Sequence, residues 1–257
     1  MKFFPINLFK KDPGYYGNYS SWQEAKEKCS GYENLLILNK VKNAVLAVKN
    51  GDALYERDSV VFHEYQCSWA VLSILLKSAI ESGNRLSVLD FGGSLGSSYF
   101  QFRPMIPEHV EVNWNIVEQE HFVMEGKRTF EDRTLKFHTS IFNIPDLSGI
   151  NVLLLSSVLP YVEEPMKLLA ELLTLNVPYV VIDRTPCFEK HRQLTMQIVP
   201  PYIYEASYPA WFLNKEELIR HLSQKYRVVS IFDALGGEIK VGARKAKEIG
   251  MLCQLNT

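Results

Sequence analysis

The sequence predicts an α/β protein whose central sheet is mostly parallel and covered by helices. Residues 87–91 form an apolar segment that runs directly into the glycine-rich turn 92–96, the pattern of a buried strand followed by a helix. Residues 151–157 form a continuous apolar run, as expected for a strand covered on both faces. Two strand-like runs, residues 226–232 and 238–244, are joined through Gly236-Gly237 and predict a final antiparallel hairpin.

Composition limits the classes of function. The chain has 257 residues, of which 47% are hydrophobic and 22% charged, enough for one substantial core with a small appendage. Its 28 basic and 29 acidic residues argue against a nucleic-acid-binding surface. It has no apolar run of about 18 residues, so we expect a soluble protein without stable membrane insertion.

The four cysteines predict free thiols. They lie far apart and match neither zinc-ligand spacing nor a compact disulfide scaffold. We therefore expect no metal site and a location in the reducing cytoplasm. A homodimer is compatible with these features. The residues are Cys29, Cys67, Cys187 and Cys253.

The first 83 residues predict an N-terminal arm and helical appendage, and residues 84–257 predict the main domain. Prolines, glycines and tyrosines in residues 1–20 indicate an irregular arm. Capping-box spacing from Ser21 predicts a short helix that ends at Gly31. Apolar residues at helical spacing predict longer helices over residues 35–48 and about 59–82.

In the main domain, predicted strands alternate with predicted helices, and three of the strands end in a carboxylate. Because the carboxyl ends of parallel strands meet at one edge of a sheet, these side chains should border a ligand site. They are Asp90, Glu118 and Asp183. The further strands are residues 110–118, 135–140 and 179–182, and helices begin near residues 97, 121, 166 and 215.

The turn after the first of these strands lacks the dinucleotide fingerprint, which would need glycine at Phe91. What remains is the spacing Asp90-x-Gly92-x-x-x-Gly96, in which glycines allow left-handed φ and close approach of a ligand to the backbone. An ordinary strand-to-helix turn is the alternative. Glu118 at the next strand end has two acceptor oxygens, which suit the two hydroxyls of a ribose. A solvated strand-end acid is its alternative.

This loop resembles motif I of the class I S-adenosylmethionine-dependent methyltransferases, except that Ser94 replaces the usual middle glycine and Gly93 precedes it. The resemblance implies a Rossmann-like, seven-stranded sheet with the last strand antiparallel. It also implies S-adenosylmethionine as cofactor, with Asp90 near its methionine end. Pro160 stands where the family often has histidine. The implied cofactor-binding residues are Asp90, Gly92, Gly93, Ser94, Gly96, Glu118, Ser140, Ser156 and Ser157, although Ser140 is as readily a turn-forming serine.

Residues 187–213 predict a long loop after the fifth strand, and residues 184–213 a substrate lid. Prolines stiffen this stretch, and its aromatic content argues against disorder. Arg184 could orient a carboxylate or phosphate of the substrate, or simply pair with Asp183. Aromatic side chains could line a sugar-binding wall or belong to the core; they are Tyr202, Tyr204, Tyr208 and Trp211.

Several segments together resemble a bacterial family described as methyltransferases, whose members occur among genes for O-antigen and lipopolysaccharide. The segments are the glycine loop, residues 183–186, and residues 198–204 with 206–209. The likeness runs from about residue 19 to the last strand. It implies O-methylation of a sugar or small-molecule precursor of a cell-surface polysaccharide.

Methyl transfer from a sulfonium is an in-line displacement and requires no metal. An alcohol acceptor would benefit from a general base, for which Asp183 and His191 are the candidates. His191 lies in a charged run and is equally well a surface histidine. Two other functions stay open: a catalytically silent, methyltransferase-like binding protein, suggested by Ser94, Ser140 and Pro160, and a nicotinamide-linked oxidoreductase, against which Phe91 weighs.

Overall fold

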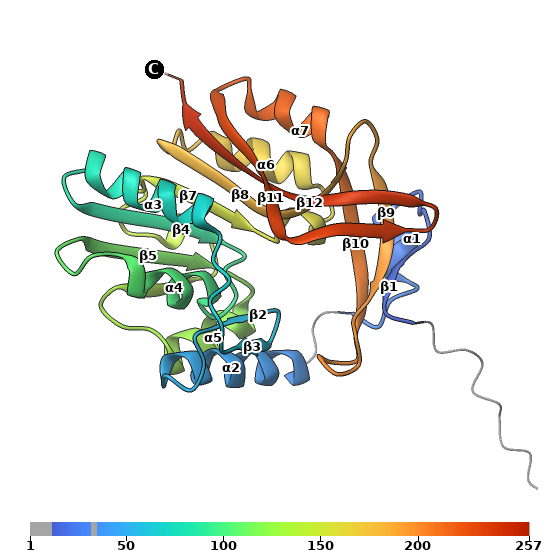
Figure 1. The fold of residues 1–257 in the computed structure, drawn as a ribbon, viewed down its shortest axis with the longest axis horizontal. Helices are drawn as coiled ribbons and strands as arrows, with labels where there is room; N and C mark the ends of the chain where they lie inside the picture. Colours follow the sequence, from blue (N-terminus) through green and yellow to red (C-terminus); the bar gives the residue numbers. More distant parts are fainter. Residues whose placement is uncertain (1–11, 32–34, 257) are drawn as a thin grey trace, which may run out of the picture.

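The computed structural model describes residues 12–31 and 35–256. Its centre is a sheet of five parallel strands in the order β6-β5-β4-β7-β8 (Figure 1). Strand β12 pairs antiparallel with β8, and β11 pairs antiparallel with β12. These seven strands confirm the predicted mostly parallel sheet with an antiparallel last strand. Their bounds are β4 (Arg85–Phe91), β5 (Glu111–Val117), β6 (Leu135–His138), β7 (Val152–Ser156), β8 (Tyr179–Phe188), β11 (Tyr226–Val241) and β12 (Arg244–Leu255).

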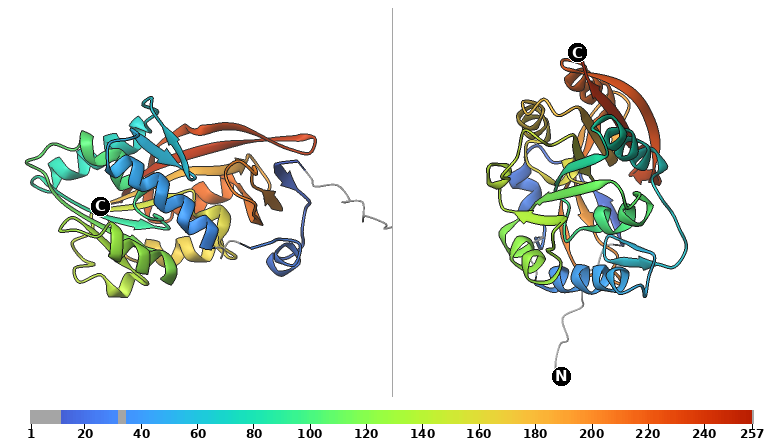
Figure 2. Two further views of the ribbon diagram at one scale, coloured as in Figure 1. Left: turned by 90° about the horizontal axis from the view of Figure 1, so that it is seen from below. Right: turned by 90° about the vertical axis from the view of Figure 1, so that its left-hand side faces the viewer.

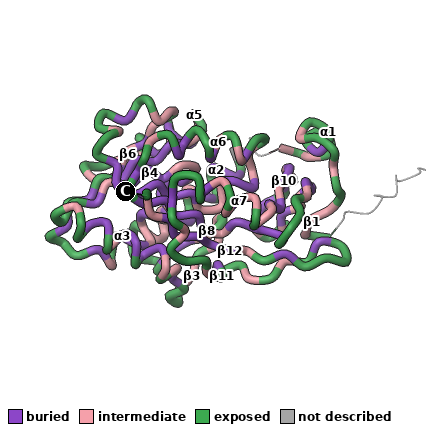
Figure 3. The backbone as a smooth tube through the Cα atoms, turned by 90° about the horizontal axis from the view of Figure 1, so that it is seen from above, coloured by how far each residue is buried: buried purple, intermediate pink, exposed green. Residues whose placement is uncertain are grey.

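Helices cover both faces of this sheet, as Figure 2 shows. Successive strand residues point to opposite faces. Val88 accordingly packs in one apolar cluster with α3, and Leu89 packs in the other with α6 and α7. Burial is concentrated on the central strands, and the outer turns are exposed (Figure 3). The helices of this part are α3 (Trp69–Glu81), α4 (Ser97–Phe102), α5 (Glu120–Thr129), α6 (Pro165–Leu173) and α7 (Lys215–Leu222), with short 3-10 turns η1 (Arg103–Met105), η2 (Ile141–Asn143) and η3 (Leu159–Tyr161).

The stretch predicted as a long loop, residues 187–213, is instead mostly β-strand. Strands β9 (Gln193–Ile198) and β10 (Ser207–Asn214) form an antiparallel hairpin, and β1 (Gly14–Tyr16) pairs with β9. β10 in turn joins the outer end of β8, which extends the sheet to ten strands. The loop prediction was wrong because β8 continues past Asp183 and supplies a partner strand that the local sequence does not reveal.

Two of the three helices predicted for the N-terminal region are present at about their expected positions, although the first ends at Lys26 and not at Gly31. Helix α1 (Trp22–Lys26) is capped by Ser21, whose hydroxyl accepts from the Glu24 N–H at 3.2 Å, and α2 (Leu35–Lys49) follows. The third helix begins at Trp69 and not near residue 59. Before it, β2 (Tyr55–Arg57) and β3 (Val60–Phe62) form a hairpin whose two turn residues, Asp58 and Ser59, have φ of 52° and 67°. Two left-handed residues make a tight hairpin turn, which interrupts the helical pattern.

The final hairpin also differs from the prediction. Gly236 and Gly237 lie within β11, where the register with β12 shifts between Asp233 and Glu238. The turn instead falls at Gly242 and the residue after it, and Gly242 has φ of 59°. The glycine pair therefore makes a bulge, and the last strand begins at Arg244 and not at Glu238.

Three further properties bear on function. None of the helices in the described part of the chain has both the length and the apolarity to cross a lipid bilayer. Within the same residues, no group of three His, Cys, Asp or Glu side chains is arranged to hold a metal ion. All four cysteines are free thiols.

Candidate functional site

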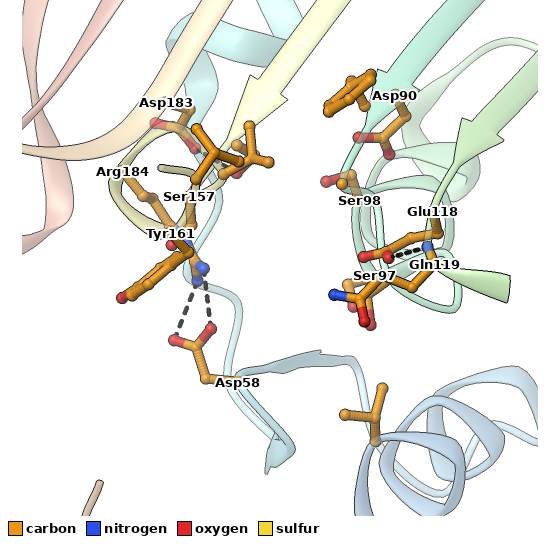
Figure 4. Close-up of a pocket in the computed structure, with 18 of the residues that line it drawn as sticks. Asp58, Asp90, Ser97, Ser98, Glu118, Gln119, Ser157, Tyr161, Asp183 and Arg184 are labelled. Carbon is orange, nitrogen blue, oxygen red and sulfur yellow. Dashed lines mark hydrogen bonds and ion pairs between the residues drawn. The ribbon is translucent and has the colours of Figure 1, made fainter. Parts of the chain in front are cut away.

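A cavity of about 1430 Å³ lies at the carboxyl ends of β4, β5 and β7. Its volume exceeds the roughly 300–1,000 Å³ of a typical small-molecule pocket, so it can hold two ligands. Figure 4 shows two facing walls. Asp90 and Glu118 lie on the wall built by β4, β5 and α4, which we call the glycine-loop wall. Asp183, Arg184 and Tyr161 lie on the other, which we call the Arg184 wall.

The glycine loop is bent tightly around the side chain of Asp90. Gly92 has φ of +72°, and a Cβ there would lie 2.5 Å from Cγ2 of Val158. A Cβ on Gly93 would lie 2.5 Å from Cγ of Asp90. Ser94 takes a φ of 55°, a left-handed conformation that normally favours glycine. The serine that departs from the family pattern therefore keeps the backbone conformation that a glycine would have.

Asp90 is a buried carboxylate with one oxygen unused. Asp90 is only 1% exposed, and its Oδ2 accepts a 3.0 Å hydrogen bond from Nε1 of Trp114. Oδ1 has no hydrogen-bond partner among the described residues. Burial, together with the smaller effect of the nearby Glu118 charge, raises the pKa of Asp90 to about 7, although the hydrogen bond from Trp114 acts in the opposite direction. A cation bound beside Oδ1 would stabilise the ionised form.

Glu118 follows β5 directly and lies half-buried beside the same loop. Its carboxylate accepts from the backbone N–H of Gln119 at 2.6 Å and from that of Ser94. Burial raises its pKa above the ordinary value. The parallel pairing of Asp90 with Ile116 and of Phe91 with Val117 fixes the two strand ends side by side. The structure thus brings Asp90, Gly92, Gly93, Ser94 and Glu118 to one wall.

The remaining residues predicted for the cofactor divide into two groups. Ser140, Ser156 and Ser157 line the cavity, but the Ser140 hydroxyl caps η2 by accepting from the Phe142 N–H at 3.3 Å. This hydrogen bond is the one expected if Ser140 is a turn-forming serine, the alternative to a cofactor-binding role. Gly96 is not among the cavity-lining residues of the described chain; with φ of +100° it precedes α4.

The Arg184 wall is built on a bulge in β8. Asp183 and Arg184 lie opposite the single residue Gly250 of β12, because the register shifts between Ile249 and Met251. Arg184 has φ of 48°. Its guanidinium donates two hydrogen bonds to Asp58, at 2.9 Å to Oδ1 and 3.3 Å to Oδ2. Asp58 was missed from the sequence because the third helix was predicted to begin near residue 59, so that β3 was assigned to helix and the hairpin was not recognised.

Asp183 has a partly used carboxylate, like Asp90. It is 6% exposed, and Oδ2 is 3.5 Å from the hydroxyl of Ser156. Oδ1 has no hydrogen-bond partner in the described part of the protein. Burial raises the pKa of Asp183, while the charge of Arg184 lowers it, and the net direction is upward.

Tyrosines extend this wall, and one further buried carboxylate, that of Glu56, lines the cavity. The Tyr161 hydroxyl donates to Oε1 of Gln197 at 2.9 Å, and its ring meets that of Tyr208 edge to face at 5.3 Å between centroids. Buried Glu56 accepts a hydrogen bond from the hydroxyl of Ser97 and another, at 3.1 Å, from the Ser59 N–H. These contacts join the β2–β3 hairpin to α4, and no local motif in the sequence announced them.

Three of the predicted catalytic and substrate residues are not brought to the cavity. Tyr204 and Tyr208 line it, but Tyr202 is 80% exposed and does not. Trp211 points elsewhere and donates from Nε1 to the carbonyl of Glu163 at 3.2 Å. His191 is exposed on the connection after β8, where its ring stacks on that of Phe188 at 4.2 Å. These placements follow from the β8 extension and the β9–β10 hairpin, which replace the expected loop.

Comparisons with known proteins give matches among solved structures alone. No protein-family profile matches the sequence, and no curated protein does. The N-terminal domain of EvdMO1, solved in the presence of S-adenosylhomocysteine and D-fucose, is similar at a TM-score of 0.48 and 12% identity, over 82% of this chain and 97% of that one. A 1,6-didemethyltoxoflavin-N1-methyltransferase from Burkholderia thailandensis was solved with bound 1,6-didemethyltoxoflavin and S-adenosylhomocysteine. It is similar at a TM-score of 0.45 and 12% identity, over 96% of this chain and 100% of that one.

A third solved structure is an S-adenosylmethionine-dependent methyltransferase from Clostridium acetobutylicum, similar at a TM-score of 0.46 and 9% identity, over 72% of this chain and 91% of that one. At these values the similarity concerns the course of the backbone only. None of the comparisons connects the chain to O-antigen or lipopolysaccharide genes, so that part of the resemblance stays a prediction.

Proposed function

We propose that this protein is an S-adenosylmethionine-dependent methyltransferase. The observation that carries the proposal is Asp90, a buried carboxylate with one unused oxygen, enclosed by a left-handed glycine loop and flanked by Glu118 at the next strand end. S-adenosylmethionine has cationic groups at its methionine end and a diol on its ribose. Those are the groups that an unpaired carboxylate and a second, neighbouring carboxylate bind.

The residues of the glycine-loop wall fit this cofactor one by one. Asp90 would hold the methionine end, and the backbone of Gly92 and Gly93 would pass close to it because neither residue has a Cβ. Glu118 would accept from the ribose hydroxyls, and Ser156 and Ser157 would border the cofactor from the end of β7. Such a bound cofactor supplies a methyl group on a positively charged sulfur.

The chain's own contribution to the reaction is positioning. Two facing walls in a cavity large enough for two ligands can hold an acceptor atom in line with the transferred methyl carbon. Holding two reactants in the reactive geometry is worth about 7–11 kcal/mol in well-oriented systems. Asp183 lies on the wall opposite Asp90, and we assign to it the role of accepting a proton from the acceptor.

The finer proposal, O-methylation of a sugar or small-molecule precursor of a cell-surface polysaccharide in the cytoplasm, rests on the sequence resemblance. The cavity supports the small-molecule part of it, since tyrosines such as Tyr161, Tyr204 and Tyr208 offer flat rings with hydroxyl groups on the Arg184 wall. A catalytically silent protein of the same fold would bind the cofactor and transfer nothing.

Calorimetric titration with S-adenosylhomocysteine and, separately, with NAD⁺ tests the cofactor. We expect S-adenosylhomocysteine to bind and NAD⁺ not to bind, and Asp90→Asn to weaken the former at least about tenfold, because a charge-assisted contact is lost. The matched control is Asp233→Asn, which removes the same charge from an exposed side chain outside the cavity. Equal binding by Asp90→Asn, or no binding by the unmodified protein, contradicts the proposal.

Radiolabelled methyl transfer then separates an enzyme from a silent binding protein. The unmodified protein is incubated with methyl-labelled S-adenosylmethionine and a panel of nucleotide-sugars, lipid-linked glycans and small amines. A labelled product that Asp90→Asn fails to form supports methyl transfer. Cofactor binding without any product would identify the silent alternative.

A further inference from the structure

The cavity has a marked excess of negative charge. Among its described lining residues are seven carboxylates and only three cations. Two of the carboxylates, Asp90 and Glu118, belong to the glycine-loop wall and are accounted for by a cationic cofactor. The others are Glu56, Asp58, Glu171, Asp183 and Glu248, and the cations are Lys26, Arg57 and Arg184.

Arg184 is the cation that follows Asp183 on this wall, and it is already paired with a carboxylate. Its guanidinium forms the two-bond pair with Asp58, whose carboxylate comes from the turn of the β2–β3 hairpin (Figure 4). Asp183 and Glu248 add further negative charge around it. This pair occupies both terminal nitrogens, with which a guanidinium would bind a phosphate or carboxylate of a ligand, and leaves Nε as the nitrogen without a partner among the described residues.

Asp183 presents the opposite situation, a buried carboxylate with one oxygen that lacks a donor. It is 6% exposed and lines the cavity, and Oδ1 has no hydrogen-bond partner in the described residues. Its other oxygen lies 3.5 Å from the hydroxyl of Ser156, and the backbone N–H of Arg184 also donates to the carboxylate. A buried polar atom without a partner calls for one, and an ammonium or amine group offers several N–H donors together with a compensating charge.

We infer that the acceptor half of the cavity selects its ligand by charge: it takes a small molecule that carries a basic amine, bound on Asp183, and it rejects phosphorylated or carboxylated molecules because Asp58 masks Arg184. This inference rests on the proposed methyltransferase function and specifies the class of acceptor. Phosphorylated sugars and nucleotide-sugars are the compounds that it excludes.

Asp58 is well suited to a test because its replacement need not disturb the fold. Its side chain is 60% exposed, and its φ of 52° is one that asparagine also tolerates. Asp58→Asn therefore keeps the hairpin turn while it releases Arg184. Loss of a merely structural ion pair would weaken all ligands alike, whereas removal of a mask would improve the binding of anions selectively.

The experiment measures binding of D-glucosamine, D-glucose and D-glucose 6-phosphate by ligand-observed NMR to protein saturated with S-adenosylhomocysteine. We expect the amine to bind at least about tenfold more tightly than the other two, as for a charge-assisted hydrogen bond. Asp183→Asn should abolish that preference. Asp58→Asn should improve binding of the phosphate at least about tenfold, and Asp233→Asn should change neither.

Three outcomes overturn the inference: tighter binding of the phosphate than of the amine by the unmodified protein, an amine preference that survives in Asp183→Asn, or no binding of any of the three sugars. Saturation with S-adenosylhomocysteine is measured first and by itself. If S-adenosylhomocysteine does not bind, the proposed function is contradicted. If it binds but the sugars show no charge preference, only the inference about the acceptor is contradicted.

Discussion

The indole N–H of Trp114 donates a 3.0 Å hydrogen bond to Oδ2 of Asp90, in the interior of the sheet. Trp114 lies on β5 and is fully buried, so this contact fixes the carboxylate against the neighbouring strand. Because Oδ2 is taken, Oδ1 is the oxygen left for a ligand. The same burial that orients Asp90 makes its charge costly in the empty protein.

The first prediction concerns stability against pH. The folded-state pKa of Asp90 is raised to about 7 from an unfolded value near 3.8, so the folded protein binds the extra proton between these values. Stability due to this group is therefore greatest below about pH 4, falls as pH rises, and is lost above about pH 7. Asp90→Asn removes the ionisation and should stabilise the ligand-free protein at pH 8, by at most about 4 kcal/mol, with little effect at pH 4.5.

Urea unfolding at the two pH values measures this difference. Asp233→Asn serves as control, since it removes the same charge from an exposed side chain outside the cavity. A variant that is less stable than the unmodified protein at pH 8 would show that the ionised Asp90 is stabilised in the ligand-free state, contrary to the effect of its burial.

The second prediction separates the roles of the two strand-end carboxylates. Asp90→Asn should weaken S-adenosylhomocysteine and leave methylthioadenosine, which lacks the amino acid portion, nearly unaffected. Glu118→Gln should weaken both ligands by a similar factor, about tenfold or more, because both contain the ribose diol. Calorimetry with the two ligands gives the comparison. Equal losses of both ligands in both variants would reject the assignment of Asp90 to the methionine end.

The third prediction concerns the glycine loop. Gly92→Ala places a Cβ 2.5 Å from Cγ2 of Val158 at a φ of +72°, whereas Gly83→Ala meets the similar φ of +66° with no heavy atom within 4 Å. Gly83→Ala should therefore show only the backbone cost of about 1–2 kcal/mol. Gly92→Ala should lose more stability and bind S-adenosylhomocysteine more weakly.

Thermal unfolding and calorimetry measure the two losses. Adding Val158→Ala to Gly92→Ala removes the clashing methyl groups and should recover part of the stability beyond that of the single variant. If Gly92→Ala proves no worse than Gly83→Ala, the close approach of the loop to Val158 is not what requires glycine there.

The fourth prediction chooses between the two candidate bases. Asp183 lines the cavity, while His191 stacks on Phe188 on an exposed connection and is not among the lining residues described. Once an acceptor has been found, Asp183→Asn should lower kcat about 10²–10⁴-fold, the usual contribution of a general base. His191→Ala should change kcat by less than about twofold, because this side chain lies outside the described lining of the cavity. A large loss in His191→Ala would require the connection to fold over the cavity during turnover.

The main sheet could be predicted because its signals are local. The apolar run that becomes β7 and the alternation along β5 are direct consequences of strands covered by helices, and the Asn214 side chain caps α7 as its spacing indicates. The glycine loop with Asp90 and Glu118 was found for the same reason. Each part is a short pattern, and parallel pairing brings adjacent strand ends together.

By itself, then, the sequence determined which groups lie at one edge of the sheet: an acid, a glycine turn and a second acid. Only the tertiary structure decided what faces them. Asp58 and Arg184 are 126 positions apart and meet because the turn of the β2–β3 hairpin lies against a bulge in β8. The sequence of this short hairpin has no pattern strong enough to predict it. Hairpin and edge-strand pairing depend on partners distant in the chain, and long-range ion pairs depend on that pairing, so neither can be read from local spacing.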